Sequence, residues 1–262
     1  MKSGVCSVTL RSLSSKEIVA LVARSGLEAI EWGGDVHVPA GDLAVAKEVK
    51  AMTEESGLKI SSYGSYYKVF DDKGRRMDFA PVLASALELG TDTIRIWAGT
   101  QPSDAVGDLQ RQRLLEGLRE DLEQARESGV RLALEFHANT LSDSNAATCR
   151  VLGELNDANL FTYWQPVYWL ADSEYRIEGL RRLAGKVLNF HVFQWLFRPG
   201  AGSWGESTER RPLVDGEEEW LRFLSVPLPD GVDRYALMEF VKGDDPLQFL
   251  EDAQALLRWL KP

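Results

Sequence analysis

The sequence has very few cysteines and no long apolar run. Cys6 and Cys149 are its two cysteines and do not form a CxxC spacing, which argues against a disulfide framework and a thiolate zinc site. No stretch approaches the roughly 18 apolar residues that span a bilayer. The opening MKSGVCSVTLRSLSS has one lysine and an apolar run interrupted by Arg11, a pattern too weak for a signal peptide. We therefore expect a cytoplasmic protein that does not bind membranes.

Positive charge is also scarce. The chain has 30 Lys and Arg against 40 Asp and Glu, a net charge of −10. Nucleic-acid phosphates and anionic membranes are bound by basic patches, so this balance argues against both classes of partner. The net charge does not exclude binding of small ligands, because a local group of arginines can lie on an acidic protein.

Short apolar runs alternate with amphipathic stretches along the whole chain, and no Pro/Ser-rich linker divides it. The runs rich in Val, Ile, Leu and aromatic residues have the pattern typical of strands. They cover residues 4–10, 27–33, 58–64, 92–99, 130–136, 159–166, 187–195 and 235–241. Apolar residues three and four positions apart, with capping residues, predict helices between them. These cover residues 14–26, 41–57, 75–90, 108–129, 143–155, 173–185, 217–226 and 245–260.

Alternating strands and helices with short connections predict parallel strands joined by right-handed crossovers. Eight such units in 262 residues match the length of a closed (β/α)8 TIM barrel, so we expect residues 1–262 to form a single barrel domain. The rival is an open doubly wound sheet. That fold commonly has a Gly-rich phosphate motif after its first strand, where this chain has RSLSS. We therefore favour the barrel.

Polar residues lie near the ends of four consecutive predicted strands. In LALEFHANT, residues 132–140, Glu135 falls on the opposite face from Leu132 and Leu134. The next three predicted strands carry Gln165, His191 and Glu239. Taken singly, such a glutamate can be solvated and such a histidine can be a hydrogen-bonded core residue. Together, at the end of a barrel where active sites lie, they indicate a mixed oxygen and nitrogen site for a divalent ion.

At these positions the chain resembles the xylose isomerase-like TIM barrel family of sugar phosphate isomerases and epimerases. The resemblance lies in GLEAIEWGGDVHVP, LALEFHANT, TYWQP, NFHVFQW and MEF, and it extends over essentially the whole chain. It implies one divalent metal ion, Mn²⁺ first and Co²⁺, Mg²⁺ or Zn²⁺ as alternatives. The implied ligands are Glu135, Gln165, His191 and Glu239. Gln165 stands where the family has an aspartate, a departure that removes one negative charge and weakens metal binding.

The resemblance implies a metal-dependent isomerase or epimerase of a sugar or sugar derivative. Glu135 and Glu239 would be the catalytic acid and base, moving a proton through a metal-stabilised cis-enediolate. Three other functions are compatible with parts of this pattern or family to different degrees. A lyase, either a dehydratase or a deglycosidase, would use the same metal and base. Gln165 motivates a non-catalytic sugar-binding subunit. A nuclease of the endonuclease IV type is disfavoured, because its zinc cluster is rich in histidine and this chain has three histidines.

Several further residues are candidates for substrate contact. His137 either contacts substrate or orients a ligand, and His37 either contacts substrate or caps the barrel. Arg95 either meets a substrate oxyanion or forms an internal ion pair, while Arg198 lies where related enzymes place a substrate-binding arginine. Of the aromatic residues near strand ends, we expect Trp97 and Tyr66 to contact substrate. The others are Trp32, Tyr63, Tyr67, Trp164, Trp169 and Trp195.

The long segment 198–212 is polar and Gly-rich, which is typical of a lid or an interface. Its Arg210 and Arg211 are interpreted as a solvated pair rather than a phosphate grip. The sequence leaves the oligomeric state open, with a homo-oligomer as one option.

Overall fold

The computed structural model describes residues 1–168, 172–198, 200 and 204–261. Its centre is a closed barrel of parallel strands in the order β1-β10-β7-β6-β5-β4-β3-β2, as the sequence predicts. The barrel strands are β1 (Lys2–Cys6), β2 (Ala29–Gly33), β3 (Lys59–Gly64), β4 (Thr93–Ile96), β5 (Arg131–Glu135), β6 (Leu160–Trp164), β7 (Val187–Val192) and β10 (Tyr235–Met238). The pairing of β1 with β10 closes the barrel.

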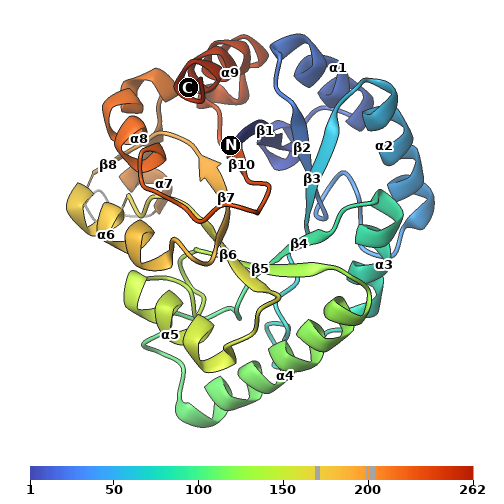
Figure 1. Cartoon of the computed structure of the whole chain (residues 1–262), viewed down its shortest axis with the longest axis vertical. Helices are drawn as coiled ribbons and strands as arrows, with labels where there is room; N and C mark the ends of the chain where they lie inside the picture. The colour runs from blue at the N-terminus through green and yellow to red at the C-terminus, as the bar shows by residue number, and fades with distance from the viewer. Residues whose placement is uncertain (169–171, 199, 201–203, 262) are drawn as a thin grey trace.

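Helices surround the strands as an outer ring (Figure 1). They are α1 (Ser15–Ser25), α2 (Leu43–Glu55), α3 (Ala80–Leu89), α4 (Asp108–Glu127), α5 (Asn145–Leu155), α6 (Ser173–Leu183), α8 (Glu217–Leu224) and α9 (Pro246–Trp259). Local chemistry sets their ends: Ser14 and Glu17 form a reciprocal capping box at the start of α1. Across the part of the chain that is described, we find no helix with the length and apolar character to cross a membrane.

The two-residue repeat of each strand separates an outer apolar face from an inner polar one. On β5, Leu132 and Leu134 belong to the main apolar core, whereas Ala133 belongs to a separate small cluster with Tyr163 and Leu237. Glu135 is two residues from Ala133 and so shares its inward direction. The same alternation sends Glu31 on β2, Arg95 on β4 and His191 on β7 into the barrel, because their sequence neighbours belong to the main apolar core.

Several predicted boundaries differ in the structure, among them the ends of the strands predicted over 92–99 and 235–241, which lie at Ile96 and Met238. Residues Ser7–Leu10 form a 3-10 helix rather than the end of the first strand. The helix predicted over 75–90 begins at Ala80, with Pro81 in its first turn, because proline is tolerated there but disrupts a helix interior. The strand predicted over 187–195 ends at Val192.

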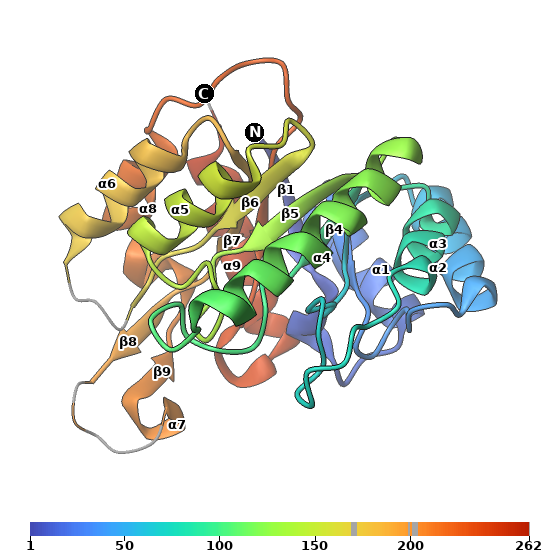
Figure 2. The same cartoon turned by 90° about the horizontal axis from the view of Figure 1, so that it is seen from below.

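A small hairpin follows β7 that the sequence did not predict. Its strands β8 (Trp195–Phe197) and β9 (Thr208–Arg210) pair antiparallel, and the short helix α7 (Trp204–Ser207) precedes β9. Figure 2 shows the three elements together, projecting from one end of the barrel. Residues 199 and 201–203 of the predicted long segment lie outside the described residues, as does Trp169.

Candidate active site

The inner face of the barrel brings a compact group of charged side chains together. Glu31 on β2, Arg95 on β4, Glu135 on β5, His191 on β7 and Glu239 just after β10 are each at most 5% exposed. They come from strands far apart in sequence, and each points inward because of its place in the strand repeat. We call these five residues the charged cluster.

The four predicted metal ligands meet around the Nδ1 atom of His191. That atom lies 2.9 Å from Gln165 Oε1, 3.4 Å from Glu239 Oε2 and 3.6 Å from Glu135 Oε1. Glu239 Oε2 is buried and has no hydrogen-bond partner among the described residues. A buried carboxylate oxygen without a partner is costly, so this atom is well suited to hold a cation.

Spacing and charge both fit a divalent ion. Ligands bound about 2.1 Å from an octahedral ion lie about 3 Å apart, close to the separations around His191. When His191 ligates a metal ion it is neutral, and the cluster then sets three carboxylates against the single positive charge of Arg95, a net charge of −2. Uncompensated buried charge costs several kcal/mol. An ion of charge +2 bound by Glu135, Gln165, His191 and Glu239 would neutralise it.

Arg95 joins two of the carboxylates. Its Nε donates to Glu31 Oε1 at 2.9 Å, and its Nη1 donates to Glu135 Oε2. Trp97 Nε1 donates to that same Glu135 oxygen at 2.6 Å. Gly64 on β3 leaves room for the pair, because a Cβ there would lie 2.7 Å from Arg95 Nη2 and 2.8 Å from Glu31 Oε1. Arg95 is therefore an internal ion-pair residue here, one of the two readings that the sequence allowed.

The surroundings shift the three carboxyl groups differently. Burial alone would raise the pKa of Glu31, but the Arg95 guanidinium, His191 and Ser62 outweigh it and lower that pKa to about 2. For Glu135, burial is likewise outweighed by Arg95, so its pKa falls well below its usual value. Burial raises the pKa of Glu239, and the nearby Glu135 charge adds to the effect. Glu239 is thus the carboxyl group best suited to accept a proton.

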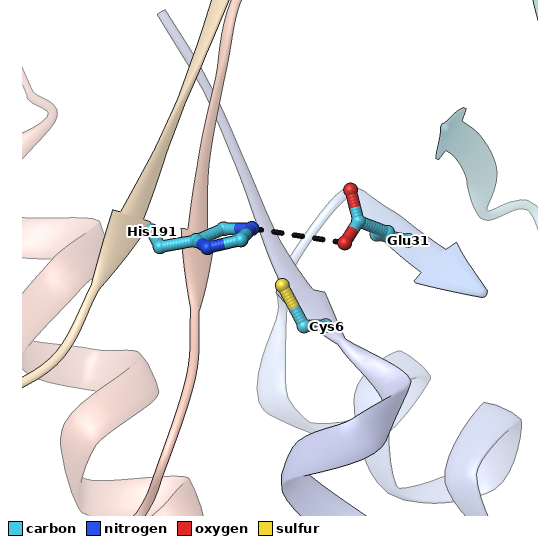
Figure 3. Close-up of side chains that lie close together, drawn as sticks. All are labelled: Cys6, Glu31 and His191. Atoms are coloured by element: carbon cyan, nitrogen blue, oxygen red, sulfur yellow. Dashed lines mark ion pairs between the residues drawn. The ribbon is translucent and has the colours of Figure 1, made fainter. Parts of the chain in front are cut away.

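Glu31 is a member of the cluster that the sequence analysis did not single out. Its carboxylate and the His191 ring point toward each other, with Cys6 beside them (Figure 3). His191 Nε2 lies 3.7 Å from Glu31 Oε1, and Ser62 Oγ donates to Glu31 Oε2 at 2.8 Å. Burial raises the pKa of the Cys6 thiol far above its usual value, so Cys6 remains a neutral neighbour. The available signal was a glutamate inside the apolar strand pattern of 27–33, the same signal that Glu135 gives.

Glu31→Gln is expected to weaken Mn²⁺ binding by about 10- to 100-fold, the usual effect of losing a group that orients a metal ligand. The substitution keeps the side-chain size but removes the charge that balances Arg95 and faces His191. Isothermal titration of metal-free protein with Mn²⁺ measures it. Cys6→Ala, which alters the same side of His191 without changing charge, is the control and should bind Mn²⁺ within a few-fold of wild type. Unchanged Mn²⁺ affinity in Glu31→Gln would contradict the orienting role.

Three predicted substrate-contact residues lie next to the cluster. Trp97 stacks on His137 with ring centroids 4.6 Å apart, and Tyr66 packs against Trp97 at 5.8 Å. A strand that continued past Glu135 would place His137 on the same face as Glu135, but β5 ends at Glu135. His137 is instead held past the strand by its Nδ1 contact with Ala138 O at 2.7 Å.

His37 and Arg198 occupy other environments. His37 is buried, and its two ring nitrogens contact Ser7 Oγ at 3.0 Å and Leu13 O at 3.2 Å. Both nitrogens therefore have partners within the protein. Arg198 follows β8 and pairs with Glu209 across the hairpin. Its predicted substrate contact stays a prediction, as does that of His37.

Arg11 is a rim residue that sequence reasoning missed as a site candidate. Its Nε donates to Asp35 Oδ2 at 2.7 Å, and its Nη2 donates to the Tyr66 hydroxyl at 2.7 Å. The Arg95 guanidinium lies 5.3 Å from the centre of the Tyr66 ring. Tyr66 thus links an exposed arginine at the rim to the buried arginine of the cluster. The sequence places Arg11 in a connection between a strand and a helix, and this position alone does not distinguish a site residue from an ordinary surface arginine.

The sequence as a whole matches one family model. The model of the xylose isomerase-like TIM barrel covers residues 19–262. The chain belongs to this family. Among curated proteins it is similar to a 3-dehydroshikimate dehydratase of Bacillus anthracis, with 25% identity over 169 residues. The matched region covers 61% of this chain and 60% of that relative's length.

Solved structures of xylose isomerase-like proteins share the fold over nearly the whole chain. A probable 3-DHS dehydratase of Bacillus anthracis superposes with a TM-score of 0.77 at 19% identity, covering 100% of both chains. A family protein of Mycobacterium smegmatis in complex with magnesium has a TM-score of 0.74 at 14% identity, covering 99% and 96%. D-Psicose 3-epimerase of Clostridium cellulolyticum has a TM-score of 0.69 at 17% identity, covering 99% and 98%.

Proposed function

We propose that this chain is a metal-dependent lyase that removes water from a polyhydroxylated, sugar-like compound with a hydroxyl group β to a carbonyl. The observation that carries the proposal is that the two candidate acid/base carboxylates, Glu135 and Glu239, differ in their hydrogen bonding. Glu135 Oε2 accepts hydrogen bonds from both Arg95 and Trp97, whereas Glu239 Oε2 has no hydrogen-bond partner among the described residues. The site therefore offers one available base rather than two equivalent ones.

Elimination of water needs a single base and a proton donor. Glu239 takes the proton from the carbon next to the carbonyl, and the electron pair of that C–H bond becomes a carbon–carbon double bond. The β-hydroxyl leaves as water after taking a proton from His137, which lines the adjoining cavity. When bound, the metal ion polarises the carbonyl and makes the neighbouring C–H more acidic. A carboxylate has two oxygens, so Glu239 can hold the ion with one and accept the proton with the other.

Similarity supports the same assignment. The curated relative is a dehydratase acting on dehydroshikimate, a substrate in which a hydroxyl group lies β to a ketone. Because the match spans 60% of that relative, its activity enters here as part of the proposal. His137 and Gln165 line one cavity, and Gln165 contacts His191, which with Glu135 and Glu239 could hold a metal ion. This places a proton donor beside the proposed metal set, as such an elimination needs.

A metal-dependent sugar epimerase or isomerase is the second candidate. It shares the first proton transfer, and the presence of two carboxylates, Glu135 at 3.6 Å and Glu239 at 3.4 Å from His191 Nδ1, favours it. Return of a proton from Glu135 rather than loss of hydroxide would then complete the reaction. This route requires Glu135 to exchange protons while it accepts hydrogen bonds from Arg95 and Trp97, so we rank it below the lyase.

Assays with Mn²⁺-loaded protein separate the candidates. We expect 3-dehydroshikimate to lose water and form a dihydroxybenzoate. The increase in ultraviolet absorbance of the aromatic product measures this reaction. D-Psicose and D-fructose are expected to remain unchanged in D₂O, without deuterium incorporation. Interconversion of the two ketoses with deuterium at the epimerised carbon would replace the lyase with the epimerase. Absence of both reactions together with absence of Mn²⁺ binding would favour the non-catalytic sugar-binding subunit.

A further inference from the structure

A cavity of about 270 Å³ opens beside the predicted metal ligands. Gln165 and His137 form its side nearest the charged cluster, and Tyr168, Phe193, Trp195 and Phe240 form most of the remaining wall. We call it the aromatic pocket. Gln165 also contacts His191 Nδ1 at 2.9 Å, so the pocket adjoins the predicted metal set.

The aromatic rings of this wall support one another. Ring centroids are 5.1 Å apart for Phe193 and Trp195, 5.1 Å for Trp195 and Phe240, and 5.6 Å for Phe193 and Phe240. These separations lie in the favourable range for tilted and edge-to-face pairs. Phe240 has a φ of 58°, a left-handed conformation that is unfavourable for a bulky residue. Its packing against the other two rings holds it there, and so the aromatic wall is built at a conformational cost.

Three polar atoms along the pocket have partners within the protein. The Tyr168 hydroxyl lies 2.9 Å from both Phe193 O and Gln194 Oε1. His137 Nδ1 contacts Ala138 O at 2.7 Å, and Gln165 Oε1 contacts His191 Nδ1 at 2.9 Å. A second sugar ring placed here would bury hydroxyl groups with few partners, which is unfavourable. A flat apolar ring would instead find aromatic surfaces on several sides.

We infer that the aromatic pocket binds a flat, unsaturated or aromatic six-membered ring that belongs to the substrate or its product. The inference rests on the proposed function, which places the reaction beside this pocket, because Gln165 and the proposed proton donor His137 line it. The volume is sufficient, because a cavity of about 150 Å³ accepts benzene. An elimination that leaves the substrate ring flatter would fit the pocket better after water is lost than before.

Binding of small probes to metal-free protein tests the pocket without turnover. Benzyl alcohol, cyclohexylmethanol and D-glucose are titrated and followed by protein NMR. Benzyl alcohol is expected to bind about tenfold more tightly than cyclohexylmethanol, because a flat ring gains aromatic contacts that a puckered ring lacks. D-Glucose is expected to bind more weakly still. Equal affinity for benzyl alcohol and cyclohexylmethanol, or tighter binding of D-glucose, would overturn the inference.

Variants locate the binding. Trp195→Leu is expected to weaken benzyl alcohol binding by about tenfold through the loss of one aromatic wall. Leu196→Ala changes the next residue of β8, which is 41% exposed, and should bind like wild type. Phe193→Leu keeps an apolar side chain and provides a second test if Trp195→Leu does not fold. Unchanged binding in a folded wall variant would place the probe elsewhere. A protein that binds benzyl alcohol in this way but dehydrates nothing would retain the pocket and lose the proposed reaction.

Discussion

Glu239→Gln is expected to lower kcat by about 10³-fold, within the range that a general base contributes. The amide keeps the size of the side chain, but it does not accept a proton from carbon. It also has no negative charge with which to bind a cation. The same change should weaken Mn²⁺ binding, because one of the two charged metal ligands is lost. Steady-state rates and Mn²⁺ titrations on the purified variant measure both effects.

Stability separates this loss from misfolding. Metal-free Glu239→Gln should unfold at the same temperature as wild type or higher, because a buried carboxyl group with a raised pKa is replaced by a neutral amide. Added Mn²⁺ should raise the unfolding temperature of wild type but not of the variant. Asp121→Asn, which changes a buried carboxylate on α4 that pairs with Arg76, is the control and should keep its Mn²⁺ affinity. Wild-type Mn²⁺ affinity and rate in Glu239→Gln would refute its assigned role.

Arg95→Met is expected to reduce the free energy of unfolding by about 3–5 kcal/mol, the usual cost of removing one partner of a buried ion pair. Arg95 is 1% exposed and compensates both Glu31 and Glu135. Without it, the cluster loses the permanent positive charge that pairs with both carboxylates. Urea unfolding of metal-free protein measures the change. Arg11→Met removes an arginine that is 42% exposed and pairs with Asp35, and should cost at most about 1 kcal/mol.

The pH dependence of this loss has a definite sign. Arg95 contributes to holding the pKa of Glu31 down to about 2, below the value of about 4.3 for an unfolded glutamate. A lowered carboxyl pKa stabilises the fold above the unfolded value, and that stability is lost as pH falls toward the folded pKa. The difference between wild type and Arg95→Met should therefore be largest near neutral pH and shrink between about pH 4.5 and pH 2.

A second substitution tests the cause. Adding Glu31→Gln to Arg95→Met should recover part of the lost stability, because one uncompensated carboxylate is removed. A loss below about 1 kcal/mol in Arg95→Met, or no recovery in the double variant, would show that the ion pair does not hold the cluster together.

The sequence by itself determined the local structure and the direction of the site residues. Strand and helix patterns depend on neighbours a few positions apart, so the alternation along the chain predicted the barrel. The two-residue repeat that places Leu132 and Leu134 in the outer core also sends Glu135 inward. The pattern of polar residues on four consecutive strands could therefore be read before their side chains were seen together.

Tertiary structure decided which side chains meet. Glu31 and Arg95 are 64 positions apart, and only the closed barrel brings them together beside His191. The sequence left Arg95 between two roles and did not mark Glu31, because a single glutamate in a strand carries no information about its partner. His37 shows the converse case, since a histidine that the sequence offered for substrate contact has both ring nitrogens engaged within the protein.

The aromatic pocket also depended on the tertiary structure. Its wall combines Tyr168 after β6, Phe193 after β7 and Phe240 after β10, segments that meet because the ends of adjacent barrel strands converge. The β8–β9 hairpin adds Trp195, which the sequence had assigned to the end of a barrel strand. Strand direction is a local property of the chain, whereas these contacts arise because β6, β7 and β10 lie next to one another in the barrel, although their residues are far apart in sequence.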